Sequence, residues 1–354
     1  MKAQEHLVAD DAAPDVGERR KPAPATTRSV RHGRVVVALG GNALLQRGQP
    51  MTIGSQREAV RLACESLASI AADSQLVVSH GNGPQIGLLA LEESAYTDVE
   101  DSPLDVLGAE TQGMIGYLIE QELVNQLPPE RSVVALVTMI EVDPHDPAFS
   151  VPTKPIGPWY SVEDAGRLAA EKGWVFRASN GSSRRVVASP TPLRILEDQP
   201  IHDLLEHGTV VICAGGGGIP TAIGEDGRLV GVEAVIDKDL ASALLATGLR
   251  ADALILATDT PGAFLRFGEP DQQFIVGGHP DAILPRYAED FGSGSMLPKI
   301  EAACSFARRS NRPAFVGSLD DIQNMLEGRA GTRISTDQVG VELTDNPTSR
   351  RRQQ

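Results

Sequence analysis

The chain has 354 residues, of which 41% are hydrophobic and 4% aromatic, and its formal net charge at pH 7 is −15. A chain of this length can bury a large core, in one α/β domain or in two smaller ones. The negative charge argues against broad binding to nucleic acid or to an anionic membrane surface, so an anionic substrate requires a local cluster of Lys or Arg. The three cysteines lack metal-ligand spacing and are expected to be buried thiols. With no apolar stretch of membrane-spanning length and no secretory signal, we expect a soluble cytoplasmic protein.

Residues 1–33 mix charges of both signs with Ala, Pro and Thr and show no hydrophobic period, which predicts a disordered tail. The stretch Val35–Leu45 then opens with a short apolar run rich in β-branched residues, which is typical of a buried parallel strand. The run ends in Gly40, Gly41 and Asn42. The N–H groups of such a turn suit an anion, although an ordinary strand-to-helix turn has the same pattern.

The same pattern then repeats. Ser55–Ala71 has helical spacing, and Gln75–Ser79 predicts a second buried strand. A turn containing Gly81, Asn82 and Gly83 follows, and a helix is predicted over Gln85–Glu93. Two such turns at the carboxyl ends of parallel strands can converge on one ligand. His80, at the start of the second turn, is interpreted as a structural histidine bonded to the backbone.

A long helix is predicted over Leu107–Leu127, where Pro128 and Pro129 end it, and Val133–Ile140 predicts a third strand. Residues 141–192 look inserted and are expected to form a small protruding lobe, which includes a helix over Val162–Lys172. This lobe contains Lys154 within the sequence TKPIGP. Prolines stiffen the backbone around this lysine, which lowers the entropy cost of fixing its side chain, although solvated loop lysines are common.

The strand Thr209–Ala214 is followed by four glycines, Gly215, Gly216, Gly217 and Gly218. A dinucleotide-binding fingerprint fails here, because the third glycine position is Pro220 and a hairpin signal at Asp226-Gly227 replaces the required helix. The sequence contains no Gly-Lys dipeptide, which excludes a Walker A loop.

The segment Val235–Asp239 opens a helix predicted to run through Leu249, with Asp239 placed to cap the helix or to contact its first turn. Lys238 stands between Asp237 and Asp239. It is therefore either part of a local ion pair or a lysine oriented by carboxylates toward an anion.

The last third of the chain continues the alternation. Ala253–Ala257 predicts a strand that ends shortly before Asp259, and the loop from Gly292 opens a helix that runs to Arg308 and carries Lys299. The remaining predicted elements are a strand at Ala314–Val316, a helix at Leu319–Leu326 and a strand at Gly331–Ile334.

Strands and helices that alternate in this way predict an open, mainly parallel sheet with a site at its carboxyl edge. Backbone N–H groups and three lysines, Lys154, Lys238 and Lys299, would form that site. No Ser/His/Asp set, metal-ligand cluster or reactive cysteine stands out. This inventory favours phosphoryl transfer, in which positioning and charge neutralisation supply most of the catalysis. An acceptor carboxylate is already ionised at pH 7 and needs no general base.

Several stretches together resemble carbamate kinase, a member of the amino acid kinase superfamily, over about residues 34–334. They are VVALGGNALL at 36–45, SHGNGPQIGLLAL at 79–91, PLDVLGAETQGMIGYLIEQEL at 103–123, EVDPHDPAF at 141–149, PTKPIGP at 152–158, AGGGGIP at 214–220, GVEAVIDKDLAS at 231–242 and GSMLPKIEAA at 294–303. The segments around Lys154 and Lys238 discriminate best.

The resemblance implies a three-layer αβα sandwich over residues 34–336, with a nucleotide lobe at about 209–334, a C-terminal tail at 337–354 and assembly as a homodimer. It implies that carbamate or the transferring phosphoryl group binds at Gly40, Gly41, Asn42, Gly81, Asn82 and Gly83. It implies that ATP or ADP, with Mg²⁺, binds at Gly215, Gly216, Gly217, Gly218, Asp259 and Met296, with no protein metal ligand assigned. Lys154, Lys238 and Lys299 would neutralise the phosphoryl oxygens, and Asp237 and Asp239 would orient the lysines or Mg²⁺.

The implied reaction is ATP + carbamate ⇌ ADP + carbamoyl phosphate, which in the family often runs toward ATP in arginine or ureide breakdown. Two alternatives remain: a kinase of another small carboxylate on the same fold, and a nucleotide-binding regulator without catalysis. The chain departs from the family at Thr260–Phe264, which affects the expected base pocket, and the N-terminal extension has no counterpart in the family.

Overall fold

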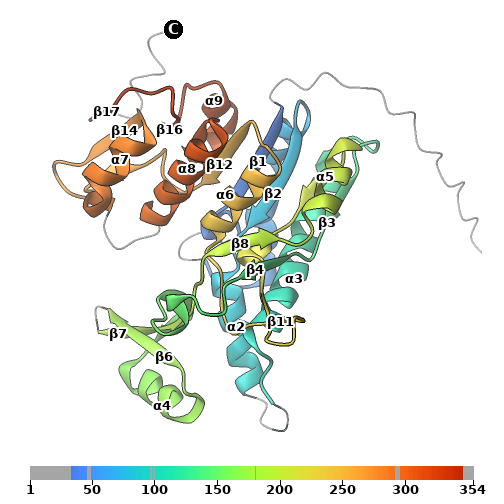
Figure 1. Ribbon diagram of the computed structural model, residues 1–354, viewed down its shortest axis with the longest axis vertical. Helices are drawn as coiled ribbons and strands as arrows, with labels where there is room; N and C mark the ends of the chain where they lie inside the picture. The colour runs from blue at the N-terminus through green and yellow to red at the C-terminus, as the bar shows by residue number, and fades with distance from the viewer. Residues whose placement is uncertain are drawn as a thin grey trace, which may run out of the picture.

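The computed structural model describes residues 33–45, 49–95, 98, 100–179, 181–291 and 296–345, excluding the side chain of Asn42. The predicted N-terminal tail lies outside the described residues, apart from Gly33. In the part described, a large sheet runs through the centre of the protein (Figure 1). Its strand order is β13-β14-β16-β15-β12-β1-β2-β9-β3, with β17 paired to β14. The bounds are β1 Arg34–Leu39, β2 Gln75–His80, β3 Val133–Ala135, β9 Val210–Ile212, β12 Ala253–Ala257, β13 Phe264–Leu265, β14 Gln273–Gly278, β15 Ala314–Gly317, β16 Thr332–Ile334 and β17 Val341–Thr344.

The central strands are parallel, since β1 pairs in parallel with both β12 and β2, and β2 with β9. Successive residues of β1 point to opposite faces and enter two separate cores. Val35, Val37 and Leu39 pack with helices α1, α3 and α9, whereas Val36 and Ala38 pack with α5, α6 and α8. The helix bounds are α1 Ile53–Ala71, α3 Leu104–Gln126, α5 Asp198–Glu206, α6 Lys238–Gly248, α8 Met296–Ser310 and α9 Ile322–Leu326. The predicted three-layer αβα sandwich is therefore confirmed.

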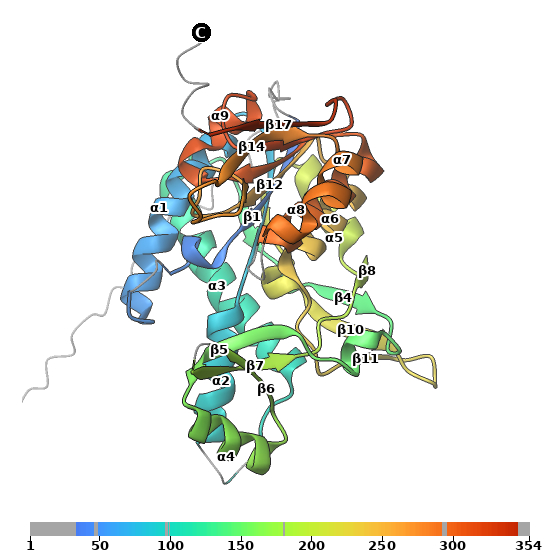
Figure 2. The ribbon, with the colours of Figure 1, turned by 90° about the vertical axis from the view of Figure 1, so that its left-hand side faces the viewer.

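A small sheet and one helix project from the sandwich (Figure 2). We call this part, residues 154–187, the subdomain. It consists of β5 Lys154–Tyr160, α4 Val162–Lys172, β6 Val175–Ser179 and β7 Ser182–Val187. The subdomain packs against α2, Gly83–Ser94, where two glycines meet: a Cβ added to Gly87 would lie 2.0 Å from the Gly157 Cα. Glycine at these positions therefore allows β5 to approach α2 closely.

Three boundaries differ from the sequence prediction. The third strand, predicted over Val133–Ile140, is two strands in different sheets. Strand β3 is an edge strand of the central sheet, while β4, Met139–Val142, lies in a four-stranded sheet ordered β11-β10-β4-β8. This sheet also contains β8, Pro192–Ile195, so the protruding part is narrower than the predicted residues 141–192. The central sheet extends past residue 336 through β17, where a tail was predicted.

Most other elements match the prediction. Helix α4 and strand β12 have the predicted bounds. The hairpin expected at Asp226-Gly227 is the antiparallel pair of β10, Ile219–Ile223, and β11, Leu229–Gly231. Helix α7, Pro280–Tyr287, packs beside α8. No helix in the described ranges is long and apolar enough to cross a membrane.

Candidate active site

The predicted turns after β1 and β2 lie side by side, because the two strands are parallel neighbours. A Cβ added to Gly40 would be 2.9 Å from the carbonyl oxygen of Ala257, the last residue of β12. A Cβ added to Gly81 would be 3.7 Å from the Lys238 Cδ. The lack of side chains here lets the turns, the end of β12 and the start of α6 converge. These turns thus border the same space as the lysine cluster described below.

The side-chain amide of Asn82 is fixed by a residue of α3. Its Nδ2 donates a hydrogen bond to Thr111 Oγ1 on α3 at 2.8 Å, and that hydroxyl is within bonding distance of the Leu107 and Gly108 carbonyls. Asn82 is only 4% exposed. Because the amide is fixed by a buried partner, its orientation is set before any ligand binds.

The four-glycine run lies beside this amide and not beside Asp259. It follows β9, which pairs with β2, whereas Asp259 follows β12 on the opposite side of β1. A Cβ added to Gly216 would be 2.2 Å from the Asn82 Nδ2, and one added to Gly215 would be 2.4 Å from the His80 ring. Gly215 and Gly216 therefore contact the turn after β2, and the binding of a nucleotide at Gly215 to Gly218 stays a prediction. The buried Gly215 and Gly216 pack against His80 and Asn82 of that turn, where only a residue without a side chain fits.

Gln112 on α3 ties the same region together and was not singled out from the sequence. Its Nε2 donates to the carbonyls of Thr138 and Gly215, at 3.2 and 3.0 Å, and its Oε1 accepts from the Thr138 N–H at 2.6 Å. Thr111 was missed as well. The available signal was that both are polar residues within the buried side of a long helix, which requires a hydrogen-bonding partner.

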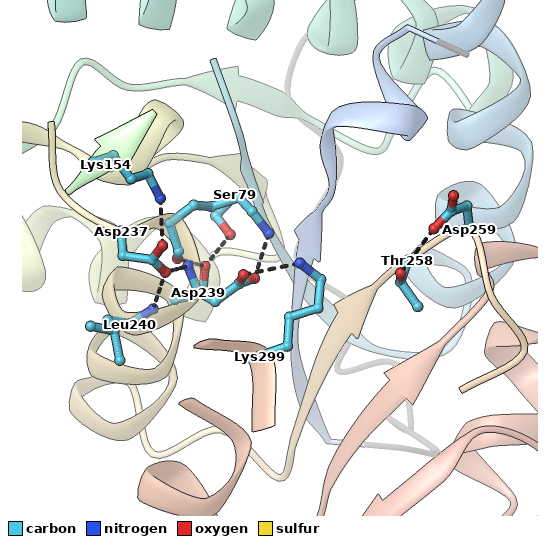
Figure 3. Close-up of polar contacts among 10 residues, drawn as sticks. Ser79, Lys154, Asp237, Asp239, Leu240, Thr258, Asp259 and Lys299 are labelled. Atoms are coloured by element: carbon cyan, nitrogen blue, oxygen red, sulfur yellow. Dashed lines mark hydrogen bonds and ion pairs between the residues drawn. The ribbon is translucent and has the colours of Figure 1, made fainter. Parts of the chain in front are cut away.

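Lys238 and Lys299 share the carboxylate of Asp239. Figure 3 shows Lys299 beside Asp239. Lys238 Nζ lies 2.6 Å from Asp239 Oδ1, and Lys299 Nζ lies 3.0 Å from Asp239 Oδ2. All three side chains are nearly buried. Burial alone raises the pKa of Asp239, but the two ammonium groups outweigh it and hold this pKa well below its usual range. Burial lowers the pKa of Lys238, while Asp239 opposes that shift.

The third lysine reaches the cluster from the subdomain. Lys154 Nζ forms an ion pair with Asp237 Oδ2 (Figure 3). The other oxygen of Asp237 accepts from the Asp239 and Leu240 N–H groups at 2.9 and 3.3 Å and caps α6. Asp237 is therefore the cap. Of the two expected roles of Asp239, the structure gives the position in the first turn and not the cap, since the buried lysines occupy both of its oxygens. The structure brings the three predicted lysines to one site.

Of the remaining predicted nucleotide residues, Asp259 lies away from the lysines, whereas Met296 is on the helix that carries Lys299. Asp259 is exposed and its Oδ1 accepts from Thr258 Oγ1 at 3.2 Å, on the far side of β1 in Figure 3. Met296 is the first residue of α8, three positions before Lys299. The loop 292–295 that precedes it lies outside the described residues.

The segment Thr260–Phe264, where a departure from the family was expected to affect the base pocket, leads into β13. Thr260 Oγ1 donates to the Gly262 carbonyl at 2.8 Å, and the Ala263 N–H donates to Thr332 Oγ1 at 2.8 Å. The segment is thus anchored to the sheet.

His80 and the cysteines have structural positions. His80 is 1% exposed, its Nδ1 lies 3.1 Å from the Gly81 carbonyl oxygen, and burial lowers its pKa to about 4, so it is neutral at pH 7. The predicted burial of the thiols is confirmed, since Cys64, Cys213 and Cys304 are all buried and burial raises the pKa of each. Among the described residues no group of three or more His, Cys, Asp or Glu side chains is arranged to hold a metal ion.

An αβα sandwich with glycine turns and clustered lysines at the carboxyl edge of its sheet defines an α/β protein of the kinase class. A profile of the Amino acid kinase family matches residues 33–318. The chain is 55% identical to carbamate kinase of Haemophilus influenzae over 308 residues, 87% of this chain and 98% of that protein. It is also 55% identical to carbamate kinase of Rhizobium meliloti, over 86% of this chain and 93% of that protein. Carbamate kinase from Giardia lamblia bound to AMP-PNP superposes with a TM-score of 0.77 at 38% identity, covering 85% of this chain and 98% of that one. The chain therefore belongs to the carbamate kinases of the amino acid kinase family.

Proposed function

We propose that this protein is a carbamate kinase, which transfers a phosphoryl group reversibly between ATP and carbamate. The observation that carries the proposal is the joining of three lysines through Asp237 and Asp239 beside the turns after β1 and β2. Such a cluster can neutralise a transferring phosphoryl group, whose charge is spread over three oxygens. The relatives named above support carbamate as the acceptor.

In this proposal the glycine turns hold the acceptor end of the reaction. Backbone N–H groups of Gly40, Gly41, Gly81 and Gly83, with Asn42 and Asn82, bind carbamate or the phosphoryl group. The nucleotide lies toward Asp259 and Met296, on the α8 side. Lys299 lies between these two ends, since it starts from α8 and reaches Asp239.

In the chemical step a carbamate oxygen attacks the γ-phosphorus. The new P–O bond forms as the bond to the bridging oxygen of ADP breaks, and no proton moves because the acceptor is already an anion. Lys238 and Lys299 are held in place by Asp239. Lys154 is the adjustable member, because its side chain is 26% exposed and its partner is on another part of the protein.

Mg²⁺ would enter with the nucleotide, since it typically keeps several waters and binds through phosphates and one or two carboxylates. This agrees with a site in which Lys154, Lys238 and Lys299 form ion pairs with Asp237 and Asp239.

We further propose a cytoplasmic homodimer that works toward ATP in arginine or ureide breakdown. Exposed apolar side chains on the outer α1 and α3 layer, Leu62, Tyr117 and Val124, support the dimer.

The test is the formation of ATP from ADP and carbamoyl phosphate with Mg²⁺, measured with a coupled assay. We expect multiple turnovers that depend on both substrates. Acetyl phosphate is the matched comparison: activity with acetyl phosphate and none with carbamoyl phosphate would favour another small carboxylate. Nucleotide binding without turnover on either would favour a regulator.

A further inference from the structure

The subdomain that carries Lys154 meets the body of the protein at a second charged contact. Arg185, on β7, is 8% exposed, and its guanidinium lies over the ring of Trp174, 3.8 Å from the ring centroid. Its Nη2 is 3.9 Å from Oε1 of Glu233 in the body. Glu233 Oε2 accepts the N–H of Leu104, the first residue of α3, at 2.8 Å. The side chain of Arg185 has no hydrogen bond to any described residue, so the ion pair with Glu233 is its charged link across the joint.

Strand register places Arg185 and Lys154 on one face of the subdomain sheet. Lys154 is opposite Val187, and Ile156 is opposite Arg185, in the antiparallel β5–β7 pair. Paired residues project to the same face, and every second residue returns to it. Lys154 and Arg185 therefore both point toward the segment 233–237.

The two cations contact this segment four residues apart, Arg185 at Glu233 and Lys154 at Asp237. Between them the Val235 N–H donates to the Ala188 carbonyl at 2.9 Å. When Lys154 turns from Asp237 toward a phosphoryl group, Arg185–Glu233 is the charged contact that remains at this end of the subdomain.

Side-chain packing leaves space at the joint. A cavity of about 250 Å³ lies there, lined among others by Leu107, Trp174, Arg185 and Glu233. Packing holds one side of the joint, since Ile156 and Val187 of the subdomain lie in one apolar cluster with Leu104, Leu107 and Val235. Atoms that line the cavity lack contacts on one side. Charged contacts beside the cavity then act together with the apolar cluster on the orientation of the subdomain. A second ion pair, Lys172 with Asp101 at 3.0 Å, also crosses the joint, and its cationic side chain is 30% exposed against 9% for that of Arg185.

We propose that Arg185 and Glu233 are a positioning pair that sets how closely Lys154 approaches the reacting groups. The inference rests on the proposed function, because it concerns the lysine that the phosphoryl transfer uses. Neither residue touches substrate. The Glu233 side chain is 59% exposed, so water screens the pair and its loss has little effect on folding. Its loss acts on the rate, because small misplacements of a catalytic group are costly.

The test compares Arg185→Gln and Glu233→Gln with the wild-type protein. Glutamine at 233 keeps an oxygen for the Leu104 N–H and removes only the charge. We expect kcat to fall on the order of 10-fold in each variant while the apparent KM for ADP is unchanged. The double variant should be no slower than the slower single variant, because the pair acts as a unit. Arg185→Lys, which keeps the charge, should recover most of the rate.

Arg167→Gln and Glu171→Gln are matched controls. These residues form an ion pair at 2.9 Å within α4, in the same subdomain, which does not cross the joint. Both control variants should retain wild-type kcat.

A fluorescence readout is independent of activity. The chain has two tryptophans, Trp159 and Trp174, so a Trp159→Phe background leaves Trp174 as the single reporter. In that background Arg185→Gln and Glu233→Gln should shift the emission of Trp174, and the control variants should not. An inactive wild-type protein would refute the proposed function. An active wild-type protein whose Arg185 and Glu233 variants keep both kcat and emission would overturn the positioning pair.

Discussion

Replacing Asp239 with asparagine removes the one negative charge that Lys238 and Lys299 share. The carboxylate is 5% exposed and lies 2.6 and 3.0 Å from the two ammonium groups. Asparagine has nearly the same shape, so packing is preserved while the charge is lost. Removing one partner of a buried ion pair typically costs about 3–5 kcal/mol, because the remaining charge is left uncompensated.

The rate should fall more than stability alone would require. Asp239 keeps Lys238 charged, since burial by itself lowers the pKa of this lysine. In Asp239→Asn that pKa falls further, so a smaller fraction of Lys238 is protonated at any given pH. We expect kcat to fall at least about 100-fold at pH 8, the usual cost of losing one well-placed charged donor. The activity of the variant should increase as the pH is lowered, because protonation restores the ammonium group.

The stability difference has its own pH dependence. The pKa of Asp239 is lowered in the folded protein, so its stabilisation is fully present above the unfolded carboxyl pKa of about 3.9 and is lost as the pH falls toward the lower folded value. The part of the difference in unfolding free energy that comes from the titration of Asp239 should therefore be constant above about pH 5 and shrink in stronger acid.

The assay is steady-state ATP formation between pH 6 and 9, together with urea unfolding over the same range and in acid. Asp337→Asn is the matched control: it breaks a carboxylate–arginine pair at 2.8 Å whose carboxylate is 63% exposed, and surface pairs contribute about 1 kcal/mol or less. A variant Asp239→Asn with wild-type kcat and the wild-type pH profile would refute the assigned role of the shared carboxylate.

Three further predictions follow from other parts of the site. Lys154→Ala should lower kcat at least about 100-fold with little change in Tm, because this side chain is partly exposed, and a near wild-type rate would remove it from the site. Gly216→Ala should destabilise the protein and reduce activity, because the new Cβ would collide with Asn82 and the residue has a φ of +66°. The control Gly227→Ala has a φ of +77° and open space around it, so it should cost only about 1–2 kcal/mol of backbone strain. Equal effects of the two variants on activity would contradict the assigned packing. The three buried cysteines should resist alkylation at pH 8 in the native state and react together in urea, as mass spectrometry would show; fast native labelling would contradict their burial.

Local pattern was sufficient for much of the fold. The alternating β-branched and apolar residues of Val35–Leu39 predict a strand buried on both faces, and the structure packs its two sides against different helix layers. Helix α4 has its predicted limits because Ser161 caps one end and Gly173, at a φ of +69°, ends the other. Such signals are local, so they can be found without knowing the tertiary structure.

What the sequence by itself determined about this protein is the alternation of strands and helices, the glycine turns at strand ends and the identity of the three lysines. Only the tertiary structure decided which side of β1 each segment joins. In the structure, Val133–Ala135 and Met139–Val142 belong to different sheets, and the four-glycine run packs against Asn82. The residue that caps α6 is Asp237 and not Asp239. The physical reason is that a turn or a charged residue has the same local pattern wherever its strand lies, whereas its partners depend on contacts between residues far apart in the chain.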